Sequence, residues 1–161
     1  MRKIARVRTL TVLPRLDGKR KSSILQFLFE SGLIEKDNAI VDISEADLSG
    51  AHLFGANLTR ASLKEANLKE ANLNLAHLDG ADLFLAKLNK ANLVYTIMSG
   101  ANLTGANLEE ANLTKAILEN TDFSRAILVK ANLNGAKVTE EQLKTARLLK
   151  GATMPDGSIH P

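Results

Sequence analysis

The chain has 161 residues, of which 45% are hydrophobic, but only 4% are aromatic and neither cysteine nor tryptophan occurs. The lack of cysteine excludes disulfides, thiol nucleophiles and thiolate metal sites. The formal net charge is +3, with nine basic and four acidic residues in 1–40 and nine basic and eleven acidic residues in 41–138. No stretch approaches the roughly 18 apolar residues that span a bilayer, and no apolar run follows the basic start as in a secretory signal. We therefore expect a soluble, cytoplasmic protein with no transmembrane segment.

Residues 1–40 are predicted to form a basic arm followed by a capping helix. The first part, residues 1–21, holds eight Lys and Arg and is interrupted by a proline and a glycine. It is open to three interpretations: a short helix, a partner-binding arm or a mobile tail. Ser23 and Gln26 then have the spacing of a capping box, and the apolar residues that follow predict a helix ending at Gly32. Because this helix is too apolar to be solvated alone, we expect it to lie on the first coil of the next region.

Residues 41–138 repeat every five residues. A large apolar residue recurs nineteen times from Leu48 to Val138 without insertion, and alanine precedes it by two positions except at Thr96 and Thr121. Steps of five would scatter these residues around an α-helix, and would alternate between the two faces of a straight strand. Both apolar positions can share one interior only if the chain bends after every repeat. The pattern therefore predicts a solenoid whose coils stack at strand spacing, roughly 4.8 Å.

The recurring large residues are expected to fill the core of this solenoid, and Ile43 is read as the centre of a further, degenerate repeat. Pairing each of them with an alanine fills a narrow tube without large aromatic side chains. Six glycines follow a central residue by two positions, where a corner with positive φ suits glycine. The core centres that we single out are Leu58, Leu78, Met98, Leu118 and Phe123.

Residues 139–161 are predicted to form a C-terminal capping helix and a tail. Thr139 and Gln142 again have capping-box spacing, and an apolar face starting at Leu143 predicts a helix that stops at Gly151. The tail after it is expected to be extended, or disordered near its end. Caps are expected at both ends because a solenoid otherwise exposes its core there.

The repeats resemble the A(D/N)LXX motif of the pentapeptide repeat family over residues 41–138. The resemblance implies an all-β solenoid: a right-handed quadrilateral parallel β-helix with four repeats per coil and about five coils, closed by short N- and C-terminal helices. Neither the four sides nor the hand follows from the period alone. The basic lead-in and the segment 23–34 before the repeats are similar to those of cyanobacterial members.

The sequence predicts no catalytic, cofactor or metal site. The histidines, at positions 52, 77 and 160, lack metal-ligand spacing and are read as surface substitutions. The carboxylates are scattered over a convex rod without a cleft, and no serine or threonine has a local histidine base. Eight asparagines that directly precede a centre could form a binding ladder, but we expect their amides to bond to turn backbone or to neighbouring coils. We therefore expect no enzyme activity.

The clearest departure from the repeat is a set of apolar residues at outward positions, which otherwise hold polar side chains. With twenty residues per coil, as the resemblance implies, this set converges on a single edge; it comprises Leu75, Val94, Tyr95, Ile97 and Ile117. Contiguous exposed apolar surface marks contact sites, and tyrosine is favoured in them. The set is open to three interpretations: a surface for a partner or a second copy, a surface covered by residues 1–21, or one without a role. Smaller apolar pairs stand at 84–85 and at 127 and 129.

A rigid rod with no pocket favours a non-catalytic protein-interaction or scaffold module, whose partner is another protein or a second copy of the chain. The family resemblance implies a first alternative, a DNA mimic that binds a topoisomerase through an acidic rod. That mechanism needs a strongly negative surface, whereas residues 41–138 have two more acidic than basic residues. A second alternative is contact of the basic arm with nucleic acid or an anionic membrane. Both rank below the scaffold, because basic tails are usually solvated.

Overall fold

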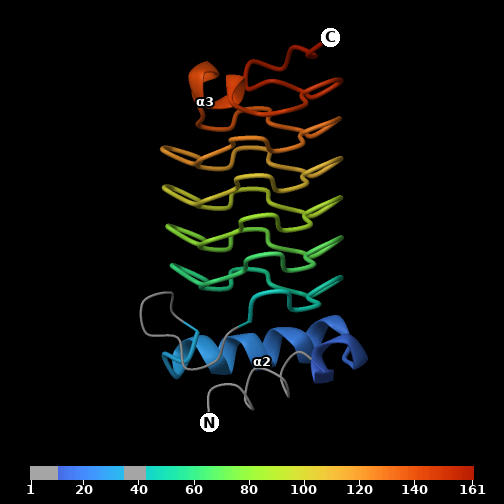
Figure 1. Ribbon diagram of the computed structural model, residues 1–161, viewed down its shortest axis with the longest axis vertical. Helices are drawn as coiled ribbons and strands as arrows, with labels where there is room; N and C mark the ends of the chain where they lie inside the picture. The colour runs from blue at the N-terminus through green and yellow to red at the C-terminus, as the bar shows by residue number, and fades with distance from the viewer. Residues whose placement is uncertain (1–10, 35–42) are drawn as a thin grey trace.

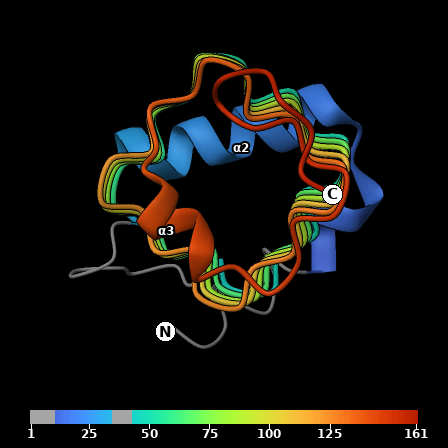
Figure 2. The ribbon, with the colours of Figure 1, turned by 90° about the horizontal axis from the view of Figure 1, so that it is seen from above.

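The computed structural model describes residues 11–34 and 43–161. The coils stack along one axis, which is vertical in Figure 1, and they superpose when the molecule is seen from above in Figure 2. Parallel bridges join residues twenty apart, from Asp47–Asn67 to Ile117–Lys137, so each coil contains four five-residue repeats. The predicted right-handed quadrilateral parallel β-helix is confirmed. Within the described ranges the bridges are isolated, because each repeat contributes only a short extended segment before the chain turns again.

Every repeat ends in the same tight turn, which makes a corner of the quadrilateral. The N–H three residues after a centre donates to the carbonyl of that centre, as Ala51 does to Leu48 at 3.1 Å. The second turn residue has φ between 54° and 67° in every repeat from Glu45 to Gly135. Six of these residues are glycines, as expected, but thirteen carry a side chain. A side chain in this left-handed conformation costs roughly 1–2 kcal/mol, so the stacking of the coils must hold these corners in place.

Both inward positions of the repeat are buried, apart from the half-buried Ala56 and Val138. The two threonines that replace alanine are buried as well, and their hydroxyls donate to main-chain carbonyls: Thr96 to Leu93, and Thr121 to Met98 at 2.8 Å. Ile43 is fully buried, and the carbonyl of this residue accepts from Ala46 as a repeat centre should. The five singled-out centres are each exposed by 1% or less: Leu58, Leu78, Met98, Leu118 and Phe123.

The N-terminal end is covered by helix α2 (Gly18–Glu30), which follows a single 3-10 turn, η1 (Leu13–Arg15). Figure 1 shows α2 lying across the bottom of the stack. The prediction that this helix starts at Ser23 is wrong. Asp17 is the N-cap, and its carboxylate accepts from Arg20 N–H at 2.9 Å. Asp17 therefore satisfies one free N–H of an earlier turn, and Ser23 lies inside the helix.

Helix α2 ends as predicted at a glycine. Gly32 has φ 64°, its N–H donates to Phe29 at 2.8 Å, and the Leu33 N–H donates to Leu28 at 2.8 Å. These two bonds form a Schellman motif, which satisfies the last carbonyls of a helix. Of the predicted basic arm, residues 1–10 lie outside the described residues, whereas the part from Gly18 onward belongs to α2.

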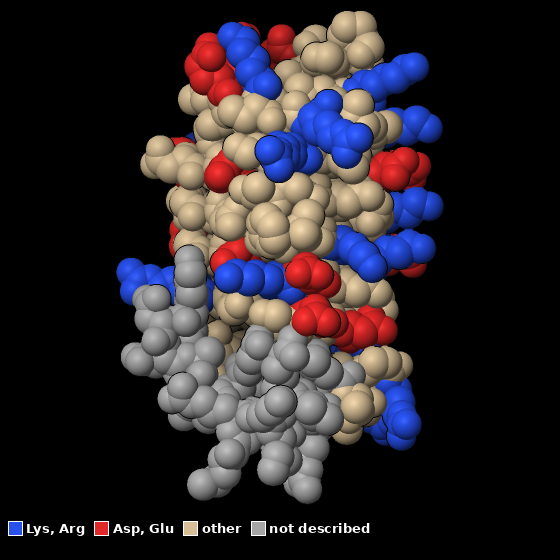
Figure 3. Space-filling model, in the orientation of Figure 1, with Lys and Arg blue, Asp and Glu red and all other residues tan. Residues whose placement is uncertain are grey.

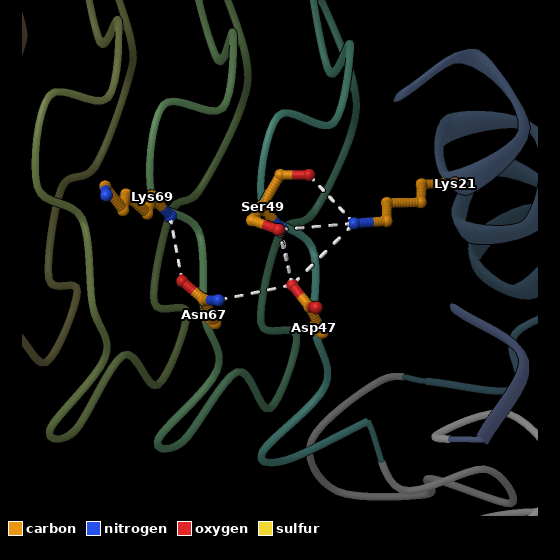
Figure 4. A network of polar contacts seen from close by, with 5 residues as sticks. All are labelled: Lys21, Asp47, Ser49, Asn67 and Lys69. Atoms are coloured by element: carbon orange, nitrogen blue, oxygen red, sulfur yellow. Dashed lines mark hydrogen bonds and ion pairs between the residues drawn. The ribbon is translucent and has the colours of Figure 1, made fainter. Parts of the chain in front are cut away.

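A buried lysine fastens α2 to the first coil, as Figure 4 shows. Lys21 is only 4% exposed. Its Nζ donates to the Ser49 carbonyl at 2.8 Å and lies 3.7 Å from Asp47 Oδ1. The same carboxylate oxygen accepts from the Ser49 hydroxyl at 2.6 Å and from the Asn67 amide at 3.2 Å. Burial alone would raise the pKa of Asp47, but the bonds from Ser49 and the charge of Lys21 outweigh it and hold that pKa below its usual value.

The C-terminal end is closed by helix α3 (Glu140–Lys144), and its predicted capping box is confirmed. Thr139 accepts from Gln142 N–H at 3.2 Å, and the Gln142 side chain accepts from Thr139 N–H at 3.0 Å. The Gln142 amide nitrogen also donates to the carbonyls of Leu118 and Thr121, at 2.8 and 2.9 Å. One side chain thus caps both the helix and the coil beneath it.

The prediction that this helix continues to Gly151 is wrong, because the chain leaves α3 at Lys144 and returns to the coil. Leu148 pairs with Ile127 and Thr153 with Asn132, at a separation of 21 residues rather than 20. The extra residue is taken up by the segment that contains α3, which lies between Lys137 and Leu148. The tail then folds back as a small hairpin, in which Thr153 pairs antiparallel with Ile159, so it is not a single extended segment.

Candidate interaction surface

The apolar residues at outward positions lie in neighbouring columns at one corner; we call them the edge patch (Leu75, Val94, Tyr95, Ile97 and Ile117). Leu75 and Tyr95 occupy the same turn position in successive coils, and the Leu75 N–H donates to the Val94 carbonyl at 3.0 Å. Ile97 and Ile117 are directly bridged. The twenty-residue coil thus brings together residues up to 42 positions apart in the sequence.

Tyr95 and Leu75 are the most exposed members, at 48% and 45%, whereas the other three are half-buried. Both adopt the left-handed turn conformation, at φ 57° and 60°. Bulky residues rarely adopt it. At the same corner, the coil below has Gly55 and a coil above has Gly135 in this position, so the chain uses the unstrained residue elsewhere in the column.

Lys115 extends the column beyond Tyr95. Its Nζ donates to the Tyr95 hydroxyl at 3.1 Å and lies 5.4 Å from the centre of the ring. A cation at this distance from a tyrosine ring is attracted to it. The patch therefore has an apolar surface and a positively charged end, with Lys115 held against the ring.

Two neighbours of the patch were not anticipated from the sequence. Lys115 was not assigned to the patch from the sequence, although its position twenty residues after Tyr95 could have assigned it. Phe54, in an outward position one coil below Asn74, is 62% exposed. It departs from the repeat in the same way as Val94, which is forty residues later.

The interpretation that residues 1–21 cover the patch stays a prediction, because residues 1–10 lie outside the described part of the chain. The hydrogen bonds between the start of α2 and the first coil are at a different corner, whereas Phe29, near the end of α2, lines a hollow with Ala56 and Asn57 below the patch. The Gly18 carbonyl accepts from His52 N–H at 3.1 Å, and Ser22 and Lys21 bond to His52 and Ser49.

The two smaller apolar pairs differ in exposure. Phe84 and Leu85 are exposed at the diagonally opposite corner, half a coil away from Val94 and Tyr95. Ile127 and Val129 are half-buried, and Leu148 pairs with Ile127.

The histidines and carboxylates do not converge. His52 and His77 bridge to Asn72 and to Ile97 on two different faces, and His160 lies in the tail. Residues 11–34 and 43–161 contain no group of three or more potential metal ligands. Ser124 bonds to Asp122 and holds the pKa of that carboxyl below its usual value, which disfavours it as a proton donor.

The asparagines before the centres have the structural role that was expected. In each of the eight, the side-chain oxygen accepts from the N–H two residues further on, at 3.0–3.3 Å. Asn92 also donates to Asn72 of the coil below at 3.5 Å. These amides hold the turns, so their oxygens are already used within the chain.

Across the described residues, no helix is long and apolar enough to cross a membrane. Among the basic residues proposed for contact with phosphates, Lys21 is buried against the first coil and Arg20 lies 3.8 Å from Asp17. Arg2, Lys3 and the other basic residues of 1–10 lie outside the described ranges.

Comparison with known proteins gives one family. A family model described as pentapeptide repeats matches in eight copies, over residues 42–80, 66–105, 81–120 and 106–140. The chain is similar to a solved pentapeptide repeat protein from the Arabidopsis thaliana thylakoid lumen, with 31% identity over 73% of this chain and 83% of that one and a TM-score of 0.66. It is also similar to Rfr23, a pentapeptide repeat protein from the cyanobacterium Cyanothece, with 35% identity over 60% of this chain and 65% of that one and a TM-score of 0.56. No curated protein matches the sequence.

The cytoplasmic location expected from the sequence stays a prediction.

Proposed function

The chain belongs to the pentapeptide repeat family, and we propose that it is a protein-interaction module that binds a partner protein through the edge patch. Members of this family are generally non-catalytic, and we propose the same of this chain. The proposed role needs only a rigid rod that presents one apolar corner to a partner.

The observation that carries this proposal is the pair of bulky, exposed side chains that stack in successive coils at one corner. Each of Leu75 and Tyr95 pays roughly 1–2 kcal/mol for its conformation, and neither is buried in return. The same φ occurs at eleven other corners that carry a side chain, among them Leu85, so the strain alone does not mark the patch. This corner differs because exposed apolar side chains stack there in successive coils. Exposed tyrosine and leucine side chains would regain buried area in a complex, where tyrosine is enriched.

The proposal is tested by affinity capture from cells that make the protein, read by quantitative mass spectrometry. Tyr95→Lys is compared with wild type and with Leu85→Lys, which makes the same exchange at an exposed, left-handed turn position of the opposite corner. A partner retained by wild type and by Leu85→Lys, but lost by Tyr95→Lys, supports the edge patch. An identical set of captured proteins for all three refutes it.

Two alternatives from the sequence are less well supported. A DNA mimic would present a continuous acidic surface, whereas Figure 3 shows basic and acidic side chains interspersed on the visible face. Lys90 and Glu110, one coil apart, form an ion pair at 3.7 Å, so the two signs alternate even within one corner. Lys21 is not available to bind phosphate from the N-terminal segment, because it is buried against the first coil.

A further inference from the structure

The chemistry of the partner can be inferred from the charges around the edge patch, and this inference rests on the proposed function. We propose that the patch binds an apolar segment of another protein that carries carboxylates, and that Lys115 pairs with one of these carboxylates. Among the described residues, Lys115 is the cation that lies over an aromatic ring, 5.4 Å from its centre.

Among residues 43–138, the stretches on either side of the patch corner contain no acidic residue. At the two ends of this surface, Asp156 follows Pro155, whose carbonyl accepts from Gly135 N–H, and Glu30 of α2 lines a hollow with Asn57. The ten Asp and Glu residues of 43–138 all lie in the other half of each coil. Because residues twenty apart stack, the carboxylate-free stretches form one continuous surface along the rod. They are residues 52–58, 72–78, 92–98, 112–118 and 132–138.

The cations of this surface have no carboxylate partner among the described residues. Lys64, Lys69 and Lys90, in the other half of the coils, each lie 3.3–3.7 Å from a carboxylate of the chain itself. Lys115 instead donates to the Tyr95 hydroxyl, which leaves ammonium protons available because this group has three donors. Lys137 lies on the neighbouring face, where it bridges to Ile117.

The same charges argue against a second copy of the chain as the occupant. A twofold contact places identical surfaces against each other. Two edge patches would bring Lys115 of both copies into one interface to which the flanking stretches of the coils contribute no carboxylate. Desolvated cations without a partner are strongly unfavourable. Nucleic acid would supply anions, but two lysines beside an apolar centre are few for a surface that relies on phosphate contacts.

The test is selection from a library of random dodecapeptides displayed on phage. The targets are the wild-type chain, Lys115→Glu and Arg125→Glu. Arg125 is the matched control, because it is an exposed basic residue in the same left-handed turn position at the opposite corner. Tyr95→Gly is a fourth target that removes the apolar contact and is compatible with the backbone at φ 57°. Far-UV circular dichroism checks that every variant is folded.

Wild type and Arg125→Glu are expected to select peptides that combine Asp or Glu with Leu, Ile, Phe or Trp. A synthetic peptide of this class should bind Lys115→Glu at least ~10-fold more weakly, corresponding to about 1.4 kcal/mol, and its affinity should fall as salt is added. Selection on Lys115→Glu should replace the acidic residues of the peptides with Lys or Arg.

Peptides that need Tyr95 but show no acidic preference, or bind Lys115→Glu as tightly as wild type, would overturn the inference and leave the proposed function standing. A dimer that Tyr95→Gly abolishes in sedimentation equilibrium, or duplex DNA binding that Lys115→Glu abolishes, would overturn it in favour of the other occupants. A selection without any peptide sensitive to Tyr95→Gly would contradict both proposals.

Discussion

Replacing Lys21 by alanine is expected to loosen helix α2 from the first coil. The substitution removes the 2.8 Å hydrogen bond to the Ser49 carbonyl and the 3.7 Å ion pair with Asp47. It also removes an aliphatic stem that is buried together with the charge. The first coil would then lose the contact that joins its corner to the cap.

The expected loss can be bounded from the geometry. Breaking a fully buried ion pair destabilises by about 3–5 kcal/mol, but the Asp47 side chain is 33% exposed and keeps its bonds from Ser49 and Asn67. A hydrogen bond from a charged donor contributes about 1.5–3 kcal/mol. We therefore expect Lys21→Ala to lower the free energy of unfolding by about 2 kcal/mol, and Lys21→Met, which keeps most of the stem, to lower it less.

The assay is urea denaturation followed by circular dichroism, together with amide hydrogen exchange of α2. Exchange is the more direct measurement, because the ends of a solenoid can open without unfolding of the whole rod. Lys19→Ala, on an exposed face of the same helix, is the control. If α2 amides exchange equally fast in Lys21→Ala and Lys19→Ala, the buried lysine does not hold the cap and the reasoning fails.

Three further predictions concern the ends and the core. The pKa of Asp47 is lowered in the folded state, so the contribution of the ionised carboxylate to stability is complete above the unfolded pKa of about 3.9 and is lost as pH falls through the lower folded pKa. The difference in unfolding free energy between wild type and Asp47→Asn should therefore shrink only below about pH 4. A constant difference down to about pH 2 would contradict this. Gly18→Ala should destabilise the cap by about 1–3 kcal/mol, although alanine favours helices, because a Cβ would lie 2.3 Å from the Gly50 carbonyl oxygen; Ser23→Ala, on the exposed face of α2, is the control in thermal unfolding. Phe123→Ala should lower the free energy of unfolding by about 3–5 kcal/mol, since its ring is fully buried, and a loss below 1 kcal/mol in urea denaturation would show that the core collapses around the gap.

The stacked coils could be predicted from the sequence because every repeat imposes the same constraint. Nineteen uninterrupted copies leave one arrangement in which alanine and the large residue share an interior, and the buried threonines fit it because their hydroxyls bond to nearby carbonyls. The edge patch could be predicted from the same period, once the coil length was known. The spacing of these residues along the sequence was enough to place them at one corner.

The ends could not be predicted as well, because no repeat constrains them. At the N-terminus Ser23 has the spacing of a cap, but Asp17 is the N-cap, and the helix begins at Gly18, whose carbonyl accepts from His52 N–H of the first coil. At the C-terminus the apolar residues after α3 rejoin the coil, and the inserted helix changes the register by one residue. The bond between Lys115 and Tyr95 also depends on where turn side chains point, which a repeat pattern does not specify.

The division between a repeated core and a variable surface explains why the edge patch is a reasonable place to look for function. The inward positions are fixed by packing, so substitution there changes stability before it changes recognition. The outward positions make few demands on the fold, and the turn position even favours glycine. When such a position instead holds a tyrosine with a lysine stacked on it, in the half of the coil that contains no carboxylate, the fold supplies no reason for that choice. Binding of an apolar, acidic segment supplies one, because it buries the ring and neutralises the lysine in a single contact.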